Sequence, residues 1–284
     1  MKRYFSQEKF ERFNKDFQPL FRSLKAFAGE LDLRLRDDYA NVYYRGNSLA
    51  KISFSKDQGY KIDIHEKFVF GEKEQNVFER VPAIFSCMKR NAAYCIFLLS
   101  ADLIKIFFQK EFLTALCRNI RNINYSEELT CEQMLITDYL NHDRIFIVDR
   151  QVTEPALRGR RIDLLALQRV FADKNQFRFL LVEIKTGKNP ELQCDVEAQL
   201  SGYRDHLKQE KVFEDWKASY QETYRQLKSI GIFEKPSDET IEIINDTHEM
   251  VFVFGYSGIA RPCIEALTKK CPDLCIKQVK LELE

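Results

Sequence analysis

Three charged residues in the second half of the chain have the types and the spacing that metal-assisted hydrolysis requires. Asp163 interrupts the apolar run of residues 162–167, and Glu183 and Lys185 stand at the end of the apolar run of residues 177–184. Both runs are rich in aliphatic and β-branched residues, so each is a predicted strand. Residues two apart on a strand share a face, and Asp163 on the neighbouring strand can reach the face of Glu183 and Lys185.

Two carboxylates that meet in apolar surroundings repel each other unless a cation compensates their charge. A hard divalent cation, Mg²⁺ or Mn²⁺, suits such a pair because it takes oxygen ligands and keeps several of its waters. One of those waters can attack a phosphodiester, and the metal neutralises the charge that develops on the phosphate. Lys185 would orient or help to deprotonate the water and would stabilise the transition state. The predicted chemistry is therefore metal-dependent hydrolysis of phosphodiester bonds.

The elements that position these residues are predicted to follow the order helix, antiparallel strands, helix, and then further elements that extend the sheet. Strands are predicted over residues 144–152, 162–167, 177–184, 250–256 and 275–284. Helices are predicted over residues 132–140, 190–206, 212–230 and 261–270. Pro190 is expected to open the helix that follows Lys185, because proline is tolerated in the first turn of a helix.

The sequence around the three residues resembles the core of the PD-(D/E)xK nuclease superfamily. The segments that carry the resemblance are Gly159-Arg-Arg-Ile-Asp-Leu-Leu-Ala-Leu167, Leu180-Leu-Val-Glu-Ile-Lys185 and Glu197-Ala-Gln-Leu-Ser-Gly-Tyr203. The resemblance implies that Asp163 and Glu183 bind Mg²⁺ and that Lys185 assists catalysis. It also implies that Gln199, on the following helix, lies beside the site. Ile162 replaces the proline of the family name, which is a variation that the superfamily tolerates.

The resemblance further implies a glutamate from the helix before the first strand. Glu132 is the first candidate for this metal ligand and Glu128 is the second. Tyr203 is expected to pack and not to take part in catalysis. Basic residues are candidate contacts for phosphates, because Lys and Arg supply most of the nonspecific affinity for nucleic acid. These candidates are Arg158, Arg160, Arg161, Lys188 and Arg45. A turn rich in arginine is often only solvated, so both interpretations of residues 158–161 stay open.

The chain of 284 residues exceeds the usual size of one domain, so two domains are expected. We place the boundary near residue 125. Residues 1–125 are expected to form an α+β N-terminal domain, and residues 126–284 an α/β domain with a PD-(D/E)xK-type core, a mixed sheet flanked by helices. Basic residues exceed acidic ones in the first half of the chain and the reverse holds in the second. This surplus favours a nucleic-acid partner weakly.

Within the first half, the patterns predict helices and a small antiparallel sheet. Phe10, Phe13, Phe17 and Phe21 recur at helical intervals, with a break expected near Pro19. β-formers on both sides of residues 45–48 predict a hairpin, and residues 60–65 alternate as a further strand. Residues 72–121 are interpreted mainly as helix.

The predicted hairpin carries aromatic and cationic residues together. Tyr43, Tyr44, Arg45, Asn47 and Lys51 could stack on bases or grip phosphates. The alternative is a half-buried sheet with a polar turn.

Several classes of protein do not fit the sequence. It contains no run of about 18 apolar residues, so no membrane span is expected. Residues 1–10 are charged throughout and lack the apolar core of a signal peptide, so a cytoplasmic location is expected. The eight cysteines stand mostly in apolar or helical contexts, as reduced thiols do. Cys271 and Cys275 are close together but lack a second Cys or His pair for a zinc site.

The expected function is that of a metal-dependent nuclease acting through Asp163, Glu183 and Lys185, with DNA as the expected substrate and Mg²⁺ or Mn²⁺ as the cofactor. The alternative is a catalytically silent module that binds nucleic acid. A further alternative is a subunit of a larger complex, for example in defence, that keeps the nuclease fold. Either a homo-oligomer or a protein partner is compatible with the sequence. The N-terminal domain would recognise nucleic acid or that partner.

Overall fold

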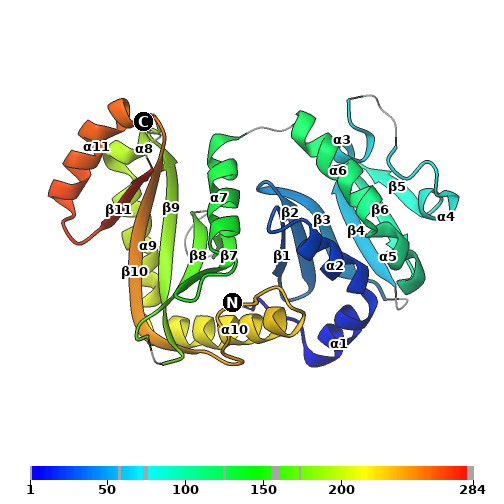
Figure 1. The fold of residues 1–284 in the computed structure, drawn as a ribbon, viewed down its shortest axis with the longest axis horizontal. Helices are drawn as coiled ribbons and strands as arrows, with labels where there is room; N and C mark the ends of the chain where they lie inside the picture. Colours follow the sequence, from blue (N-terminus) through cyan, green and yellow to red (C-terminus); the bar gives the residue numbers. More distant parts are fainter. Residues whose placement is uncertain are drawn as a thin grey trace. The chain divides into compact units, whose positions relative to one another are not determined.

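The protein is a mixed α/β structure with two separate sheets (Figure 1). The computed structural model describes residues 2–56, 59–72, 76–123, 126–154, 160–172 and 174–279. These residues form two compact units. The N-terminal unit comprises residues up to 133 together with residues 226–232, and the C-terminal unit comprises residues 134–225 and 233–284. Two helices therefore contribute to both units, α7 (Glu127–Asp138) and α10 (Glu210–Ser229).

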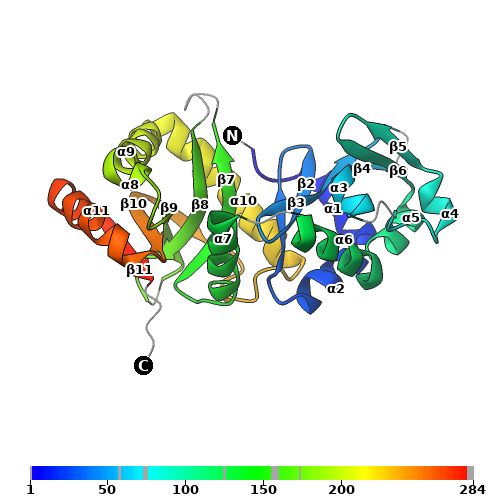
Figure 2. The same cartoon turned by 90° about the horizontal axis from the view of Figure 1, so that it is seen from above.

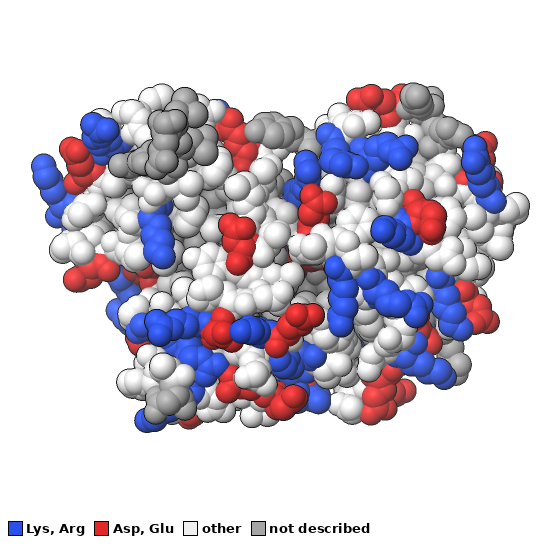
Figure 3. Space-filling model, in the orientation of Figure 1, with Lys and Arg blue, Asp and Glu red and all other residues white. Residues whose placement is uncertain are grey.

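The N-terminal unit contains a six-stranded antiparallel sheet in the order β1-β2-β3-β4-β6-β5. The strands are β1 (Leu31–Leu35), β2 (Tyr39–Tyr44), β3 (Asn47–Phe54), β4 (Tyr60–His65), β5 (Met88–Asn91) and β6 (Tyr94–Leu99). The helices are α1 (Gln7–Asp16), α2 (Gln18–Ala26), α3 (Glu66–Phe70), α4 (Pro82–Phe85), α5 (Ala101–Phe107) and α6 (Lys110–Ile123). Over the helices of this unit, Lys and Arg are interspersed with Asp and Glu (Figure 3).

Aromatic side chains fill the space between the helices and one face of this sheet. Phe13 and Phe17 stack with ring centroids 4.5 Å apart, and Phe17 meets the edge of Tyr60 on β4 at 4.8 Å. The Tyr60 hydroxyl donates a 2.6 Å hydrogen bond to Asp16 at the end of α1. The helical spacing of the phenylalanines and the break before Pro19 are thus confirmed, since α1 ends at Asp16 and α2 begins at Gln18.

The predicted hairpin at residues 45–48 and the strand at residues 60–65 are confirmed, but the prediction of helix over most of residues 72–121 is wrong. β5 and β6 form a hairpin within this segment, and β6 pairs with β4 along its whole length. Cys95 and Phe97 are buried while Tyr94 and Leu98 are exposed, which is the alternation of a strand. A short apolar run does not distinguish a strand from a buried helix, and here pairing with the distant β4 decides between them.

Gln226, near the end of α10, holds the N-terminal segment in place through two hydrogen bonds of its side chain. The side-chain oxygen of Gln226 accepts a 3.0 Å hydrogen bond from the backbone N–H of Phe5, and its amide nitrogen donates to the Phe5 carbonyl at 2.8 Å. Gln226 is fully buried. The N-terminal unit is therefore discontinuous in sequence.

The C-terminal unit contains a five-stranded mixed sheet in the order β11-β10-β9-β8-β7. Its strands are β7 (Ile145–Thr153), β8 (Arg161–Arg169), β9 (Gln176–Thr186), β10 (Glu242–Phe254) and β11 (Cys275–Val279). β7, β8 and β9 are antiparallel neighbours, whereas β10 runs parallel to both β9 and β11. The helices that lie wholly in this unit are α8 (Glu191–Cys194), α9 (Val196–Leu207) and α11 (Ser257–Lys270). All five strands predicted for this half of the chain are present.

The face of β9 that carries Glu183 and Lys185 packs against two helices. Phe179 faces α10, where its ring meets the edges of Trp216 and Tyr220 at 6.0 and 5.8 Å. Glu183 and Lys185 lie two and three strand periods farther along this same face. α9 covers this face at its other end (Figure 2), where Arg204 lies 2.8 Å from Glu249 of β10.

The described cysteines form no disulfide, and two of them are deeply buried. Every cysteine whose side chain the structure describes is free. Burial raises the pKa of both Cys117 and Cys131 to about 12, so these two thiols stay protonated. None of the helices in the described ranges is both long enough and apolar enough to span a bilayer.

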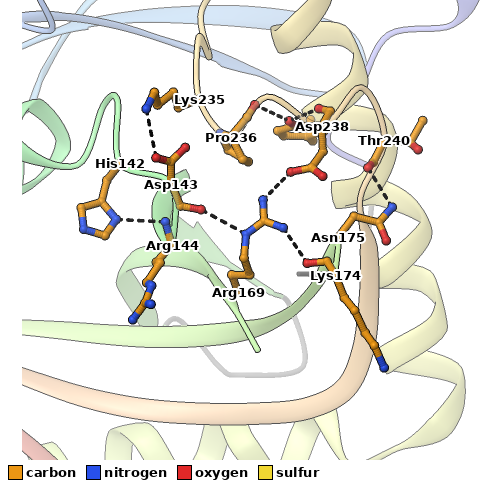
Figure 4. A network of polar contacts seen from close by, with 11 residues as sticks. His142, Asp143, Arg144, Arg169, Lys174, Asn175, Lys235, Pro236, Asp238 and Thr240 are labelled. Carbon is orange, nitrogen blue, oxygen red and sulfur yellow. Dashed lines mark hydrogen bonds and ion pairs between the residues drawn. The ribbon is translucent and has the colours of Figure 1, made fainter. Parts of the chain in front are cut away.

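An arginine ties three segments together at the end of the sheet away from Glu183 (Figure 4). The Arg169 guanidinium donates to the carboxylate of Asp238 and to the carbonyl oxygens of Lys174 at 2.5 Å and Asp143 at 3.3 Å. Asp143 in turn accepts from Lys235 at 3.0 Å. The side chain of Arg169 is 11% exposed, so these bonds are largely shielded from water.

We expect Arg169→Ala to lower the free energy of unfolding by about 2–3 kcal/mol, because the carboxylate and two carbonyls would lose a charged donor. Chemical denaturation followed by circular dichroism measures the change. Lys174→Ala is the matched control, since it removes an exposed side chain and leaves the carbonyl of the network in place. Equal stabilities of the two variants would show that the network contributes little.

Candidate active site

The structure brings Asp163, Glu183 and Lys185 together on one face of the C-terminal sheet. Leu165 of β8 pairs with Leu181 of β9, so Asp163 and Glu183 each lie one strand period beyond this pair on the same face. The backbone N–H of Ile184 donates a 2.9 Å hydrogen bond to Asp163 Oδ2. The two carboxyl groups are therefore held beside each other by the strand pairing itself.

The electrostatics of the pair are dominated by burial. Glu183 is 1% exposed, and burial together with the neighbouring Asp163 raises its pKa to about 9. Burial also raises the pKa of Asp163, although the Ile184 N–H and Lys185 oppose the shift. In the absence of another cation, the site therefore favours a proton on the pair near neutral pH.

Lys185 is surrounded by carboxylates. Its Nζ lies 3.2 Å from Glu183 Oε2 and 2.7 Å from Glu191 Oε2. Burial lowers the pKa of Lys185, but Glu183, Glu191 and Asp163 outweigh burial and hold the pKa above its ordinary value. The ammonium form of Lys185 is thus the form that the site stabilises.

Glu191 joins this site although sequence reasoning did not single it out. It is the first residue of α8, and the side chain of Asn189 accepts a 2.9 Å hydrogen bond from its backbone N–H. Gln199 Nε2 lies 3.5 Å from Glu191 Oε2, so Glu191 links the predicted helix glutamine to Lys185. An acidic residue in the first turn of a helix is common, because it interacts favourably with the helix dipole. The sequence therefore contained no signal that set Glu191 apart.

Three buried polar atoms at the site lack a hydrogen-bond partner among the described residues, namely Glu183 Oε1, Gln199 Oε1 and Tyr203 Oη. Buried polar atoms are normally satisfied, so such a group needs an explanation. A hard cation with its bound waters would supply partners for these oxygens. The carboxylates that would hold it are Asp163 and Glu183, and the donor set fits Mg²⁺ or Mn²⁺.

The additional predicted ligands lie in the N-terminal unit. Glu132 is 2% exposed in the part of α7 that belongs to this unit, and Glu128 is half-buried one turn earlier. Within the described residues, no group of three or more His, Cys, Asp or Glu side chains is arranged to hold a metal. The assignment of Glu132 or Glu128 as a ligand therefore stays a prediction.

Three of the five residues predicted to contact phosphates lie in the described part of the C-terminal unit. Arg160 donates a 3.1 Å hydrogen bond to the Ala198 carbonyl of α9, and the exposed Arg161 lies two residues before Asp163. The Lys188 ammonium lies 3.0 Å from the Tyr256 hydroxyl.

The other two predicted contacts are not at this site. Arg158 lies outside the described residues. Arg45 occupies the hairpin turn of the N-terminal unit, where it lies 3.5 Å from Glu30.

Comparisons with known proteins do not identify this site. A scan against protein-family models, a search of curated proteins and a search of solved structures each found no match. The interpretation of the site therefore depends on its own geometry and chemistry.

The buried carboxyl group of Glu183 predicts a pH-dependent stability in EDTA. Its pKa rises from 4.5 in the unfolded chain to about 9 in the folded one, so the folded protein holds a proton that the unfolded chain releases. Stability should therefore fall between about pH 5 and about pH 9. Glu183→Gln cannot lose this proton and should show a shallower fall.

Thermal melting across this pH range tests the expectation. Glu239→Gln, which removes an exposed carboxyl group of the same unit, is the control and should follow the wild type. Parallel curves for wild type and Glu183→Gln would contradict the assignment of a proton to this pair.

Proposed function

We propose that the C-terminal unit is a metal-dependent nuclease domain of the PD-(D/E)xK type that hydrolyses phosphodiester bonds in DNA. The observation that carries the proposal is the buried pair of carboxyl groups, Asp163 and Glu183, beside the ammonium of Lys185. Two adjacent acids at the end of two paired strands are costly in isolation, and a divalent cation offsets this cost.

Asp163 and Glu183 would hold Mg²⁺ or Mn²⁺. When bound, the metal supplies an activated water and neutralises charge on the phosphate. The protein contributes rigid placement, since both carboxylates stand on paired strands and the Ile184 N–H fixes one of them. The proposed catalytic centre is thus built on the sheet and not on a loop.

Lys185 is proposed to orient the attacking water and to stabilise the charged transition state, and not to act as the base. Carboxylates on both sides keep its pKa above the ordinary value, so it carries a proton at neutral pH. Glu191 and Gln199 are proposed as positioning residues, because Glu191 holds the ammonium at 2.7 Å and contacts the Gln199 amide. Arg160 and Arg161, which shortly precede Asp163, are proposed to contact phosphates of the DNA.

A catalytically silent module that binds nucleic acid is the second candidate. The specific observation in its favour is that, among the described residues, no third His, Cys, Asp or Glu side chain is arranged with Asp163 and Glu183 to hold a metal. A subunit that becomes active only within a larger complex shares this geometry.

Cleavage of linear, circular and single-stranded DNA in Mg²⁺, Mn²⁺ or EDTA tests the proposal. We expect the wild type to cleave only with metal. Lys185→Ala should reduce the rate at least about 100-fold, because it removes the cation that stabilises the transition state. Lys174→Ala removes an exposed lysine at the other end of the sheet and should cleave at the wild-type rate.

Calorimetric titration with Mg²⁺ separates the two candidates. Uptake of metal that Asp163→Ala abolishes supports the nuclease. The absence of both metal uptake and cleavage, with DNA binding intact, would support the silent module and refute the nuclease.

Glu191→Gln tests the positioning role. We expect cleavage to fall roughly 10- to 100-fold. The alkaline limb of the pH–rate profile should move to lower pH, because one carboxylate that raises the pKa of Lys185 is removed. Glu197→Gln, which breaks a surface ion pair with Lys270 on the neighbouring helix, should leave the profile unchanged. A lower rate with an unshifted profile would indicate a structural role alone.

A further inference from the structure

The N-terminal sheet leaves a polar face exposed opposite its helices. Alternate residues of β4 point in opposite directions, so Tyr60, Ile62 and Ile64 are buried while Lys61 and Asp63 lie on the other face. This second face is hollowed over β3 to β6 by a groove of about 540 Å³. The groove is lined by Ser48, Lys51, Lys61, Asp63, His65, Phe68, Asn91, Tyr94 and Ile96.

The strand pairing sets the lining side chains in rows across the sheet. His65 pairs with Tyr94, and Tyr94 pairs with Asn91. Asp63 lies between Lys51 on one neighbouring strand and Ile96 on the other. Every side chain in these rows can therefore touch a ligand that lies across the strands.

Aromatic rings form one end of the groove. The His65 ring lies 5.5 Å from the ring of Tyr94 and 5.5 Å from that of Phe68. Tyr94, the first residue of β6, is 49% exposed. An exposed ring at the edge of a groove offers a surface on which a base can stack.

Beyond the aromatic rings, the groove carries several cationic side chains and one acid. Lys61 Nζ lies 3.0 Å from Asp63 Oδ2, so this acid is already neutralised. Lys51 is exposed, with its ammonium 4.1 Å from the Tyr39 ring centroid, and exposed Lys89 pairs with Ile96 at the far side. The net charge of these side chains is positive and complements a phosphate backbone.

We propose that this face of the N-terminal sheet binds single-stranded nucleic acid, with Tyr94 stacking on a base and Lys51 and Lys61 contacting phosphates. A single strand is favoured over a duplex, because a duplex hides the faces of its bases from an exposed ring. The choice of nucleic acid as the ligand rests on the proposed nuclease function. The binding site itself does not include the residues of the proposed active site.

Fluorescence anisotropy of a labelled oligothymidylate, titrated with the full-length protein in EDTA, tests the proposal without cleavage. We expect Tyr94→Ala to weaken binding about 5- to 100-fold, since each stacked base contributes substantially to affinity. Tyr94→Phe keeps the ring and should bind like the wild type. A labelled duplex and a labelled oligouridylate serve as further probes.

Lys51→Gln and Lys61→Gln should each reduce the slope of log affinity against log salt concentration by about 0.7, which is the value for one phosphate contact in a single strand. Lys15→Gln, which changes an exposed lysine of α1, is the matched control and should leave the slope unchanged.

The proposal is overturned if Tyr94→Ala and both lysine variants bind oligothymidylate like the wild type, or if the wild type binds the duplex alone. Tyr94-dependent binding without metal-dependent cleavage would uphold this inference and refute the nuclease. If cleavage depends on Lys185 but binding is unaffected by Tyr94→Ala, the nuclease proposal is upheld and the present inference is refuted.

Discussion

The repulsion between two buried carboxyl groups is the constraint on which the candidate active site depends. Asp163 and Glu183 are set beside each other by the pairing of β8 with β9, and the Ile184 N–H holds the Asp163 carboxyl group in place. The hydrogen-bonding network of the sheet thus maintains an arrangement in which the two groups would repel each other if both were ionised. The ammonium of Lys185 offsets part of this repulsion, and the carboxylate of Glu191 in turn neutralises part of the charge on Lys185.

Much of this arrangement could be predicted from the sequence, because strand alternation is a local property. The positions of Asp163, Glu183 and Lys185 on one face follow from spacing along β8 and β9. Glu191 could not be predicted, because its contact with Lys185 depends on the turn between β9 and α8. The same limit explains the error at β5 and β6, where pairing with the distant β4 overrides a locally ambiguous pattern.

In both sheets, strand alternation places charged side chains on one face, but the two sheets differ in whether that face is covered. In the C-terminal sheet, helices pack on the face of β9 that carries Glu183, so its charged end is enclosed and the pKa values shift. In the N-terminal sheet, the face with Lys61 and Asp63 stays open, and its charged side chains meet water. Enclosure favours chemistry that needs perturbed groups, whereas an open polar face favours reversible binding.

The bond between Gln226 and Phe5 has a consequence for biosynthesis. Phe5 leaves the ribosome before Gln226, whose side chain is the partner of its backbone and lies 221 residues later in the chain. The N-terminal unit therefore reaches its full set of contacts only after most of the C-terminal sheet has been translated. A shortened gene product that ends before this glutamine would carry the whole antiparallel sheet and still leave the polar backbone of Phe5 without its buried partner.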